Sequence, residues 1–457
     1  MAKRKFDFDL IVLGSGAGGS AAANIAAKAG LNVAIVENDL FGGESPNYSD
    51  IPRAAISKVK KAFFEAKKAE KMGLRSANLT YNFPIISAWK KNVIKRTGAH
   101  DNQKFFESMG IKTFRGEARF LTPNEISINQ KHYSAKNFLI ATGSKISIPD
   151  IKNIENVRYY TPKTIFDITR PPKSIFIVGG GAEAVEIAQI LAIFGTKVYI
   201  SEVSARLLPK EDEEVGITIE NILVEESHVY VLPQTRVVAV QKDGLMKRVI
   251  FQRGGTEKFV RVDEILVVGE RIPNIDIGLE NAHIDFSKDG IAVNEFSQTS
   301  MKHIFAVGGV VNPQAQTAKI LLESRTVAHN ILHSRSKIEV KFPLSPRTIS
   351  TWPEIATVGL TEDDCLKRDL KYKTAIAPLN LIAKSNVENF SSGFAKIICD
   401  RKGKIIGGSI VSPDAINLIS QISLAIRNEM TAHDLAEIPQ PFLSWSEIIR
   451  VAAHKIK

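Results

Sequence analysis

Three glycines near the start of the chain have the spacing of a phosphate-binding turn. Gly14, Gly16 and Gly19 fit the pattern GxGxxG, and Glu37 follows 18 residues after the last of them. In such a turn the first glycine permits a tight bend, the second lets a pyrophosphate approach the backbone, and the third lets a helix pack on a strand. The anion lies at the helix N-terminus, where free N–H groups favour negative charge. Glu37 can accept hydrogen bonds from an adenosine ribose, so we predict a dinucleotide site.

A second pattern of the same kind occurs about 165 residues later. It consists of Gly179 and Gly181, with Ala184 in place of the third glycine, and Glu202 after the next strand. The carboxylate of Glu202 would bind a ribose 2′-hydroxyl and repel a 2′-phosphate, which favours NADH over NADPH. Ala184 slightly favours the opposite choice, and Arg206 could meet a phosphate, although an ordinary surface arginine is the simpler interpretation.

Each glycine turn lies between an apolar strand and a helix that leads to a second strand. The expected segments are a strand at 9–13, a helix at 20–29 and a strand at 32–36, followed by their counterparts at 175–178, 185–194 and 197–200. A strand–turn–helix–strand unit that occurs twice is an internal repeat. The repeat predicts two domains of the dinucleotide-binding α/β type.

The rest of the chain supplies further elements but no third glycine turn. We expect a basic helix at 51–72, irregular and β-rich sequence before a strand at 138–142, and later strands at 265–268 and 304–307. Beyond about residue 342 the pattern becomes α+β, a natural dimer-forming piece. Its expected elements are strands at 395–399 and 405–411 around a turn at 401–404, with helices at 416–427 and 446–453.

Composition places the chain among ordinary globular proteins. Hydrophobic residues make up 44% and charged residues 24%, and no apolar run approaches the roughly 18 residues of a membrane span. The first residues do not form a signal peptide, since Asp7 and Asp9 interrupt them, so we expect a cytoplasmic protein without a membrane partner.

The net charge of +11 raises the alternative of nucleic-acid binding. The cations are spread along the chain, mostly on expected helices such as 57–71, so a solvated helix face is favoured and no nucleic-acid partner is expected. The two cysteines, Cys365 and Cys399, lie 34 residues apart. They form no CxxC pattern, so we expect two packed thiols and no metal site.

These motifs together resemble the pyridine nucleotide–disulfide oxidoreductase family, which includes dihydrolipoamide dehydrogenase and mercuric reductase. The resemblance covers essentially the whole chain. It includes Ala141-Thr142-Gly143, VVGERIPN around Arg271, IFAVGG at 304–309, STWPEIATVGLTE at 350–362 and GFAKIICDRKGKIIGGSIV at 393–411. It implies two Rossmann-like domains and a C-terminal α+β dimerisation domain.

The resemblance also implies FAD on the first unit, NADH or NADPH on the second, and a homodimer. The FAD domain would be 1–150 continued at 275–337, the NAD(P) domain 151–274, and the dimerisation domain 338–457. Beyond the two glycine turns, the implied cofactor-binding residues are Gly43, Thr142, Gly143, Arg271, Gly308 and Gly309.

The sequence departs from the family where the chemistry takes place. The family's active helix follows GGxCxxxxCIPxK, whereas this chain has GGESPNYSDIPRA from 42 to 54. Ser45 and Asp50 replace the two cysteines, and neither can take part in dithiol–disulfide exchange. Ala54 replaces the lysine near the flavin, so Glu186, the family's partner of that lysine, is expected to lack its cation.

Two further positions differ. Phe442 stands where the family has a histidine, which leaves Glu447 without a titratable partner to orient. Gly309 follows Gly308 in place of the aspartate that holds the ribityl chain. One lost charged hydrogen bond is worth about 1.5–3 kcal/mol. We therefore expect FAD to bind more loosely, and an aspartate at 309 to tighten it.

Two functional hypotheses remain open on the sequence. The first is an FAD-dependent NAD(P)H oxidoreductase that passes electrons from reduced flavin directly to a small external acceptor, with Asp50, Glu186 and Glu447 as candidate catalytic residues. The second is a catalytically retired dimer that senses nucleotides or acts as a scaffold. Asp50 could pair with Arg53 beside the flavin, or Ser49 or Asp50 could merely cap the helix.

Overall fold

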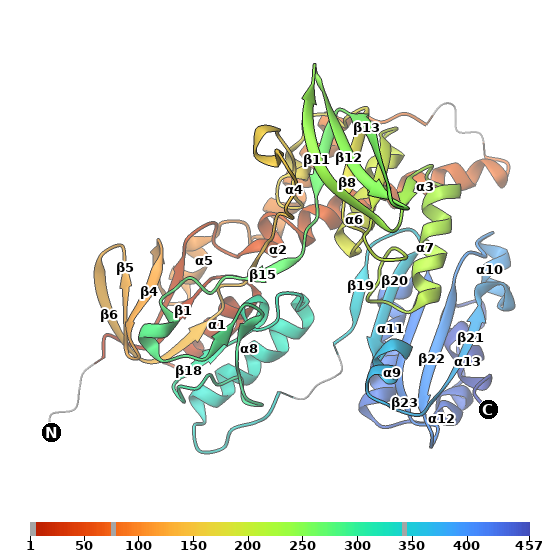
Figure 1. Cartoon of the computed structure of the whole chain (residues 1–457). Coiled ribbons are helices and arrows are strands. Elements are labelled where there is room, and N and C mark those ends of the chain that lie inside the picture. Colours follow the sequence, from red (N-terminus) through yellow and green to blue (C-terminus); the bar gives the residue numbers. More distant parts are fainter. Residues whose placement is uncertain (1–5, 75–78, 341–344) are drawn as a thin grey trace. The chain divides into compact units, whose positions relative to one another are not determined.

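The computed structural model describes residues 6–74, 79–340 and 345–457. The chain folds into two compact units, and each unit contains segments that are far apart in the sequence. Unit 1 consists of Met1–Ala55, Ser87–Ile148 and Gly269–Lys341, and unit 2 of Ile56–Ile86, Pro149–Val268 and Phe342–Lys457. Figure 1 labels the elements that are named below.

A seven-stranded sheet forms the centre of unit 1. Its parallel part has the order β3-β2-β1-β6-β18, and β5 and β4 continue it antiparallel beyond the start of β6. The strands are β1 (Phe8–Leu13), β2 (Val33–Glu37), β3 (Lys112–Arg115), β4 (Ala118–Thr122), β5 (Glu125–Ile128), β6 (Lys131–Ile140) and β18 (Ile304–Ala306). Ile11 and Leu13 of β1 face one apolar core, while Leu10 and Val12 face another. A strand that is buried on both faces explains the apolar run at residues 10–13 of β1.

The helices α1 (Ala17–Lys28) and α8 (Thr317–Leu332) pack against each other in unit 1 (Figure 1). Shorter elements surround the sheet. They are α2 (Glu44–Asn47), α5 (Gln103–Ser108), β7 (Ser144–Ile146), β15 (Arg271–Pro273), β16 (Phe286–Ser287), β17 (Gly290–Ile291), η3 (Leu279–Ala282) and η4 (Gly308–Val310). Helix α3 (Asp50–Lys71) begins in unit 1 and continues in unit 2.

The expectation of irregular and β-rich sequence before residue 138 was wrong in one stretch. Residues Phe83–Thr97 form the helix α4, and Gln103–Ser108 form α5. Asn82 Oδ1 accepts a hydrogen bond from Ile85 N at 3.2 Å, and Pro84 lies in the first turn, where a missing N–H is tolerated. The proline therefore marks the start of a helix here rather than irregular chain.

Unit 2 contains a parallel sheet with the order β10-β9-β8-β14 and a separate antiparallel sheet, β11-β12-β13. The elements are β8 (Ser174–Val178), α6 (Ala182–Ile193), β9 (Lys197–Ser201), α7 (Glu213–Glu225), β10 (Tyr230–Leu232), β11 (Thr235–Asp243), β12 (Met246–Arg253), β13 (Thr256–Val262) and β14 (Glu264–Val267), with η1 (Ile154–Asn156) and η2 (Ile165–Asp167) before them. The strand–turn–helix–strand order around β8 repeats the order around β1.

The C-terminal part of unit 2 is a five-stranded antiparallel sheet with the order β19-β20-β23-β22-β21. Helix α11 packs on β20 and β23, and α13 on β21 and β22. The elements are β19 (Arg347–Ile349), β20 (Glu354–Gly359), α9 (Glu362–Lys367), β21 (Tyr372–Pro378), η5 (Leu379–Leu381), α10 (Ala383–Val387), β22 (Phe394–Asp400), β23 (Ile405–Ser412), α11 (Ala415–Arg427), α12 (Ala432–Glu437) and α13 (Glu447–His454). Cys365 and Cys399 are buried free thiols in this part.

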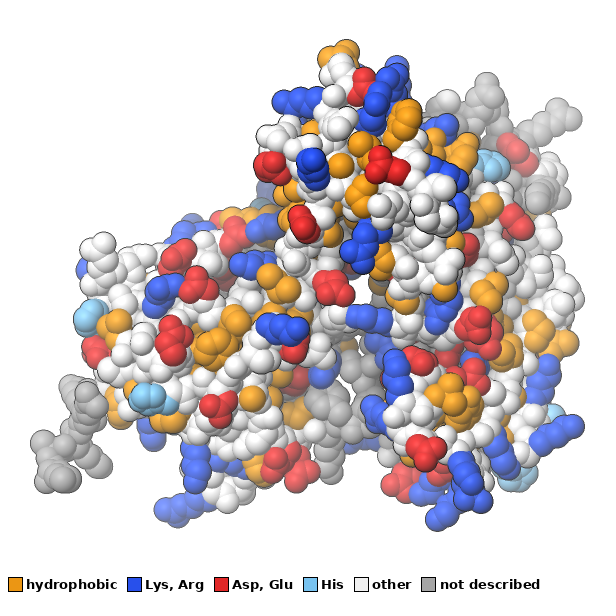
Figure 2. All heavy atoms as spheres, in the orientation of Figure 1, with side chains coloured by type: hydrophobic (Ala, Val, Ile, Leu, Met, Phe, Trp, Pro, Cys, Tyr) orange, Lys and Arg blue, Asp and Glu red, His pale blue; other side chains and the backbone are white. Residues whose placement is uncertain are grey.

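Lysine side chains do not all lie on a solvated helix face, as the sequence suggested for 57–71. Lys60 is only 1% exposed, and its ammonium donates a hydrogen bond to Ser350 O. On the face seen in Figure 2, basic side chains are interspersed with acidic ones. Among the described residues, no helix is long and apolar enough to cross a membrane.

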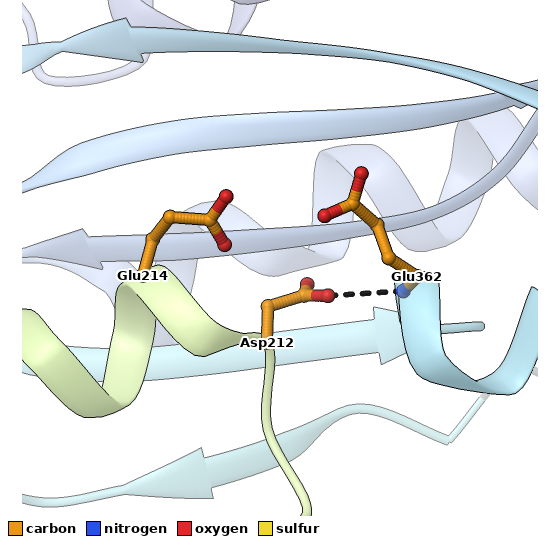
Figure 3. A group of neighbouring side chains, drawn as sticks. All are labelled: Asp212, Glu214 and Glu362. Carbon is orange, nitrogen blue, oxygen red and sulfur yellow. Dashed lines mark hydrogen bonds between the residues drawn. The ribbon is translucent and has the colours of Figure 1, made fainter. Parts of the chain in front are cut away.

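A buried lysine holds three carboxylates of unit 2 together. Lys396 on β22 is fully buried, and its Nζ lies 2.6 Å from Glu362, 2.8 Å from Glu214 and 3.5 Å from Asp212. Figure 3 shows the three carboxylates facing one another from the starts of α7 and α9. Burial opposes the ammonium form, but the hydrogen bonds and charges of these carboxylates outweigh it and raise the pKa of Lys396. A group of acids that could hold a metal ion thus already surrounds a cation.

We predict that Lys396→Met destabilises the protein by about 3–5 kcal/mol, because it leaves three carboxylates together without their cation. Because the pKa of Lys396 is raised in the folded state, its contribution is fully present near pH 7 and is lost only as the pH rises through the folded-state pKa. Urea unfolding of both proteins at about pH 7 measures the loss.

Lys404→Met is the matched control. Lys404 pairs with Glu429 on the surface at 2.6 Å, and its loss should cost less than about 1 kcal/mol. Equal effects of the two substitutions would contradict the assigned role of Lys396.

Candidate functional site

The first glycine turn leaves its backbone bare at one position. Gly14 has φ +99°, and a Cβ there would lie 2.3 Å from Ala141 O; a Cβ on Gly19 would lie 1.9 Å from Gly14 O. Both positions therefore exclude a side chain. At Gly16 a Cβ would meet only Gly43 Cα, at an ordinary contact distance of 3.8 Å, so a small group fits beside this residue at the N-terminus of α1. An open backbone at a helix N-terminus suits a pyrophosphate.

The second turn has the same design. Gly179 has φ +110°, and a Cβ there would lie 2.2 Å from Val268 O. Gly181, at the N-terminus of α6, has no atom within 4 Å of a Cβ position. Ala184 takes the third position and is fully buried. The residues of both turns thus fit a dinucleotide.

The two acids make equivalent contacts in the two units. Glu37 accepts hydrogen bonds from Ser15 N and Asp39 N, both at 2.9 Å. Glu202 accepts them from Gly180 N and Ser204 N, both at 2.8 Å. In each case the donors are the residue after the first glycine and the residue two positions beyond the acid. Both oxygens of Glu202 and Oε1 of Glu37 keep a lone pair for a ribose hydroxyl, whereas Glu37 Oε2 also accepts from Ser15 Oγ.

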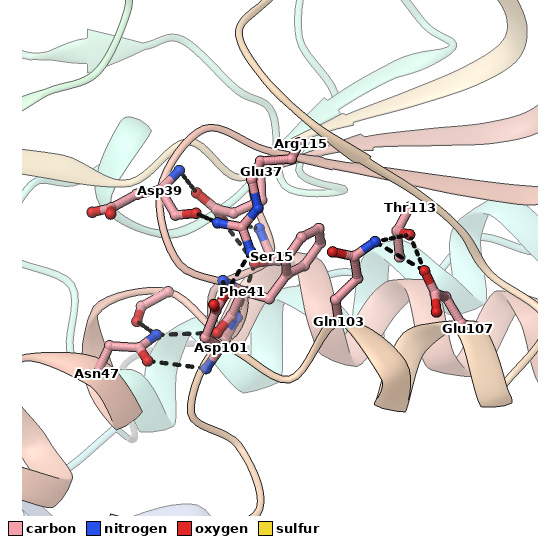
Figure 4. A network of polar contacts seen from close by, with 12 residues as sticks. Ser15, Glu37, Asp39, Phe41, Asn47, Asp101, Gln103, Glu107, Thr113 and Arg115 are labelled. Carbon is pink, nitrogen blue, oxygen red and sulfur yellow. Dashed lines mark hydrogen bonds and ion pairs between the residues drawn. The ribbon is translucent and has the colours of Figure 1, made fainter.

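Further polar contacts fix the loop after Glu37 (Figure 4). Ser15 Oγ donates to Glu37 at 2.6 Å and accepts from Gly42 N at 3.0 Å. Asp101 accepts from Phe41 N at 2.9 Å and pairs with Arg115 at 2.7 Å. Burial opposes the ionised form of Asp101, but these two donors outweigh it and lower its pKa. The loop that carries Gly42 and Gly43 is therefore held against the first glycine turn.

Asp50 is the first residue of α3 and has a cation beside it. Its Oδ1 lies 3.1 Å from Arg53 Nη2, and its Oδ2 accepts a hydrogen bond from Thr317 Oγ1 at 3.0 Å. The pair suggested by the i,i+3 spacing is present. The Asp50 side chain is 42% exposed.

Thr142 and Gly143 belong to a loop that is fixed by mutual hydrogen bonds. Thr142 Oγ1 donates to Asn274 O, and Asn274 Nδ2 donates to Thr142 O, both at 2.8 Å. Asn274 N also donates to Gly143 O at 3.0 Å. The next strand, β7, pairs with β15, which begins at Arg271.

Arg271 forms a bidentate ion pair with Glu44, at 2.9 Å and 2.5 Å. Sequence reasoning did not single out Glu44. The only feature of the sequence that could have indicated Glu44 is a charged residue directly after two glycines.

The backbone around Gly309 leaves too little room for an aspartate, which the sequence did not indicate. A Cβ on Gly309 would lie 2.9 Å from the backbone of Gly143 and Ser144, so any side chain would require that backbone to move. Gly308 has φ +76°, and its N–H donates to Glu323 at 2.9 Å. Burial raises the pKa of Glu323. Tighter FAD binding is therefore not expected from Gly309→Asp alone.

Glu186 and Glu447 lie in unit 2. Glu186 is 3% exposed, and Ser350 N donates a hydrogen bond to its carboxylate. The donor is a backbone N–H, and the expectation that Glu186 lacks the cation found in the family stays a prediction. Glu447 begins α13 with Arg450 at 3.5 Å, and Phe442 is 79% exposed.

Arg206 is not an ordinary surface arginine. Its guanidinium donates to Leu208 O at 2.7 Å and to Glu211 O at 2.8 Å, both in the loop after Glu202. These contacts turn its charge toward the protein backbone.

Two alternating β/α units with glycine turns and terminal acids define a protein that binds two dinucleotides. Residues 8–330 match the pyridine nucleotide-disulphide oxidoreductase family, and residues 345–453 match the dimerisation domain of that family. The chain belongs to this family. The predicted fold class, two Rossmann-like domains with a C-terminal dimerisation domain, is confirmed.

Similar proteins include enzymes with different substrates. The chain is 27% identical to the mercuric reductase of Lysinibacillus sphaericus over 450 residues, which cover 98% of this chain and 82% of that protein. It is 30% identical to the dihydrolipoyl dehydrogenase of Geobacillus stearothermophilus, over 97% of this chain and 95% of that protein. The HOCl-induced flavoprotein disulfide reductase RclA from Escherichia coli shares the fold, with a TM-score of 0.85 at 23% identity over 98% of this chain and 100% of that chain.

The open spaces at the two turns lead to paired predictions. Gly16→Ala should lower the affinity for FAD about tenfold or more and leave NADH binding intact, whereas Gly181→Ala should do the reverse. In both cases a methyl group fills the space beside a bare helix N-terminus without a clash, so the unfolding midpoint should stay near that of the wild type.

Flavin fluorescence and NADH titration measure the two affinities. Each variant serves as the control of the other. Equal loss of both nucleotides in either variant would show that the turns do not act as separate sites.

Proposed function

We propose that this protein is an FAD-dependent NAD(P)H oxidoreductase that acts as a homodimer and passes electrons directly to a small external acceptor. The observation that carries the proposal is the equivalence of the two glycine turns. Both leave the backbone bare at a helix N-terminus, and both orient a buried acid by the same two backbone donors. A quinone, a dye, a metal ion or oxygen could serve as the acceptor.

FAD would be held by Gly14, Gly16, Gly19 and Glu37, with Gly43, the Thr142–Gly143 loop, Arg271 and the Gly308–Gly309 segment around it. NADH would be held by Gly179, Gly181 and Glu202. When bound, FAD supplies a group that accepts a hydride from nicotinamide and releases electrons to an acceptor. The chain's part is to bind both nucleotides, orient their riboses and set the charge around the flavin.

The two thiols of the chain are unsuited to a redox role. Burial is the main cause that raises the pKa of both Cys365 and Cys399, the latter to about 11, so both remain protonated near neutral pH. A protonated, buried thiol is a poor nucleophile. Electron transfer is therefore expected to proceed without cysteine.

The test is the purified double variant Cys365→Ser/Cys399→Ser. We expect it to be yellow, to bleach with NADH under anaerobic conditions and to reduce a dye at a rate within about twofold of the wild type. Loss of dye reduction in a folded, FAD-containing variant would contradict a thiol-independent reaction. A colourless wild type that does not take up FAD would instead favour the nucleotide-sensing or scaffolding dimer.

Nicotinamide choice should follow the charges near the ribose of the second nucleotide. Glu202 is negative and held in place, while Arg206 is occupied by backbone carbonyls. We predict that NADH reduces the flavin faster than NADPH, and that Glu202→Gln lowers this preference by about tenfold or more because it removes the repulsion of a 2′-phosphate.

Stopped-flow bleaching with each nucleotide measures the preference. Lys210→Gln, an exposed change in the same loop, should leave the ratio unchanged. A wild type that prefers NADPH, or a ratio that depends on Lys210 rather than Glu202, would overturn the assignment.

Asp50 and Arg53 should shift the midpoint potential of the flavin in opposite directions, because Asp50 stands where the family keeps a cysteine near the ring. Asp50→Asn leaves the cation and should raise the midpoint potential. Arg53→Gln leaves the anion and should lower it. Shifts of roughly 30 mV, equivalent to about 1.4 kcal/mol for a two-electron couple, are expected.

Spectroelectrochemistry of the two variants provides the measurement. Unchanged potentials in both, with full FAD content, would leave Asp50 only a structural role at the start of α3. In that case Asp50→Asn should lower the free energy of unfolding and leave the midpoint potential unchanged.

A further inference from the structure

An acidic residue directly follows the chain segment that contacts the first glycine turn. A Cβ on Gly43 would lie 2.4 Å from Gly16 Cα, so the backbones of these two glycines touch. Gly42 N donates to Ser15 Oγ at 3.0 Å, which fixes the same segment from its other side. Glu44 is the next residue and begins α2. Glu44 is therefore the residue that directly follows the contact with the bare helix N-terminus.

A carboxylate at this place opposes what the turn is built to bind. A dinucleotide carries a doubly charged pyrophosphate, and like charges that lie near each other in a partly buried site repel strongly. The helix dipole and the free N–H groups attract the same anion. Glu44 thus acts against the glycine turn unless its charge is compensated.

The compensation comes from a residue that is 227 positions away in the sequence. Arg271 meets Glu44 with two parallel hydrogen bonds, from Nη1 at 2.9 Å and from Nη2 at 2.5 Å. Its Nη1 also lies 3.4 Å from Ser144 Oγ. The Arg271 side chain is 21% exposed and that of Glu44 36%, so water screens the pair only in part. The bidentate geometry holds the guanidinium against both carboxylate oxygens.

We propose that Glu44 and Arg271 form a charge-matched pair that sets the affinity for FAD. This inference rests on the proposed FAD site and adds the residues that limit its strength. Arg271 neutralises Glu44 and so keeps the glycine turn attractive to an anion. Glu44 occupies Arg271, which would otherwise add a positive charge to the site. The negative charge of Glu44 therefore holds the affinity below the level that the turn and Arg271 would give without it.

The two single substitutions then have opposite effects. Arg271→Met leaves the Glu44 charge without this arginine and should weaken FAD binding about tenfold, whereas Glu44→Gln removes a negative charge and should tighten it about three- to tenfold. The double variant should return to within about threefold of the wild type. Because the effect is electrostatic, the deficit of Arg271→Met should shrink between about 50 mM and about 500 mM salt.

The experiment is the titration of FAD into flavin-depleted protein, followed by flavin fluorescence, with rebinding of the wild type as the reference. Arg271→Lys should restore part of the loss. Arg119→Met is the matched control, since Arg119 forms an exposed ion pair with Asp276 in the same unit. This variant should bind FAD with the affinity of the wild type.

The outcomes separate this inference from the function on which it rests. A wild type that binds no FAD overturns the proposed function and the inference together. A wild type that binds FAD, with Glu44→Gln unchanged, overturns the inference alone. A double variant as weak as Arg271→Met, or a deficit that salt does not reduce, would show that Arg271 only maintains the local fold.

Discussion

The hydrogen bond from a glycine turn to a buried carboxylate is the contact on which both nucleotide sites depend. In each unit a strand ends in a bend that only glycine can adopt, and the next N–H donates to an acid at the end of the neighbouring parallel strand. The contact fixes the turn and the acid together. One pair of neighbouring strands therefore positions both the phosphate-binding end and the ribose-binding end of a site. Each acid is held by backbone donors. Its free lone pairs then remain available to a ribose.

Two acid–arginine pairs lie in unit 1 at positions that the proposal assigns to the flavin site. At the start of α3, Asp50 is paired with Arg53 and accepts a hydrogen bond from Thr317. At the phosphate turn, Glu44 is paired with Arg271. Both pairs introduce an acid and a compensating arginine into unit 1. Such pairs alter the potential or the affinity of a bound anion but cannot store electrons, which leaves the flavin as the only redox group of the proposal.

Spacing along the chain was sufficient to predict the glycine turns and their strands, because those features depend on local geometry. The i,i+3 pair of Asp50 and Arg53 could be predicted for the same reason. The contacts of Glu44 with Arg271 and of Gly309 with Ser144 could not, since each joins segments that are far apart in the sequence. Burial of Lys60 was missed because a lysine-rich helix normally faces water, and here one ammonium reaches a backbone carbonyl of a distant segment. Helix α4 was missed although its sequence holds a proline only in the first turn, where a helix tolerates it.

An anaerobic titration of the purified protein with NADH tests most directly whether the flavin works without a disulfide. A flavin as the sole redox group accepts two electrons, so one equivalent of NADH per bound FAD should complete the bleaching, with no later phase. A flavin coupled to a disulfide would take up four electrons and require two equivalents. Completion at one equivalent, followed by full reoxidation with a dye, is the predicted result. A requirement for a second equivalent, or no bleaching by NADH at all, would contradict the account.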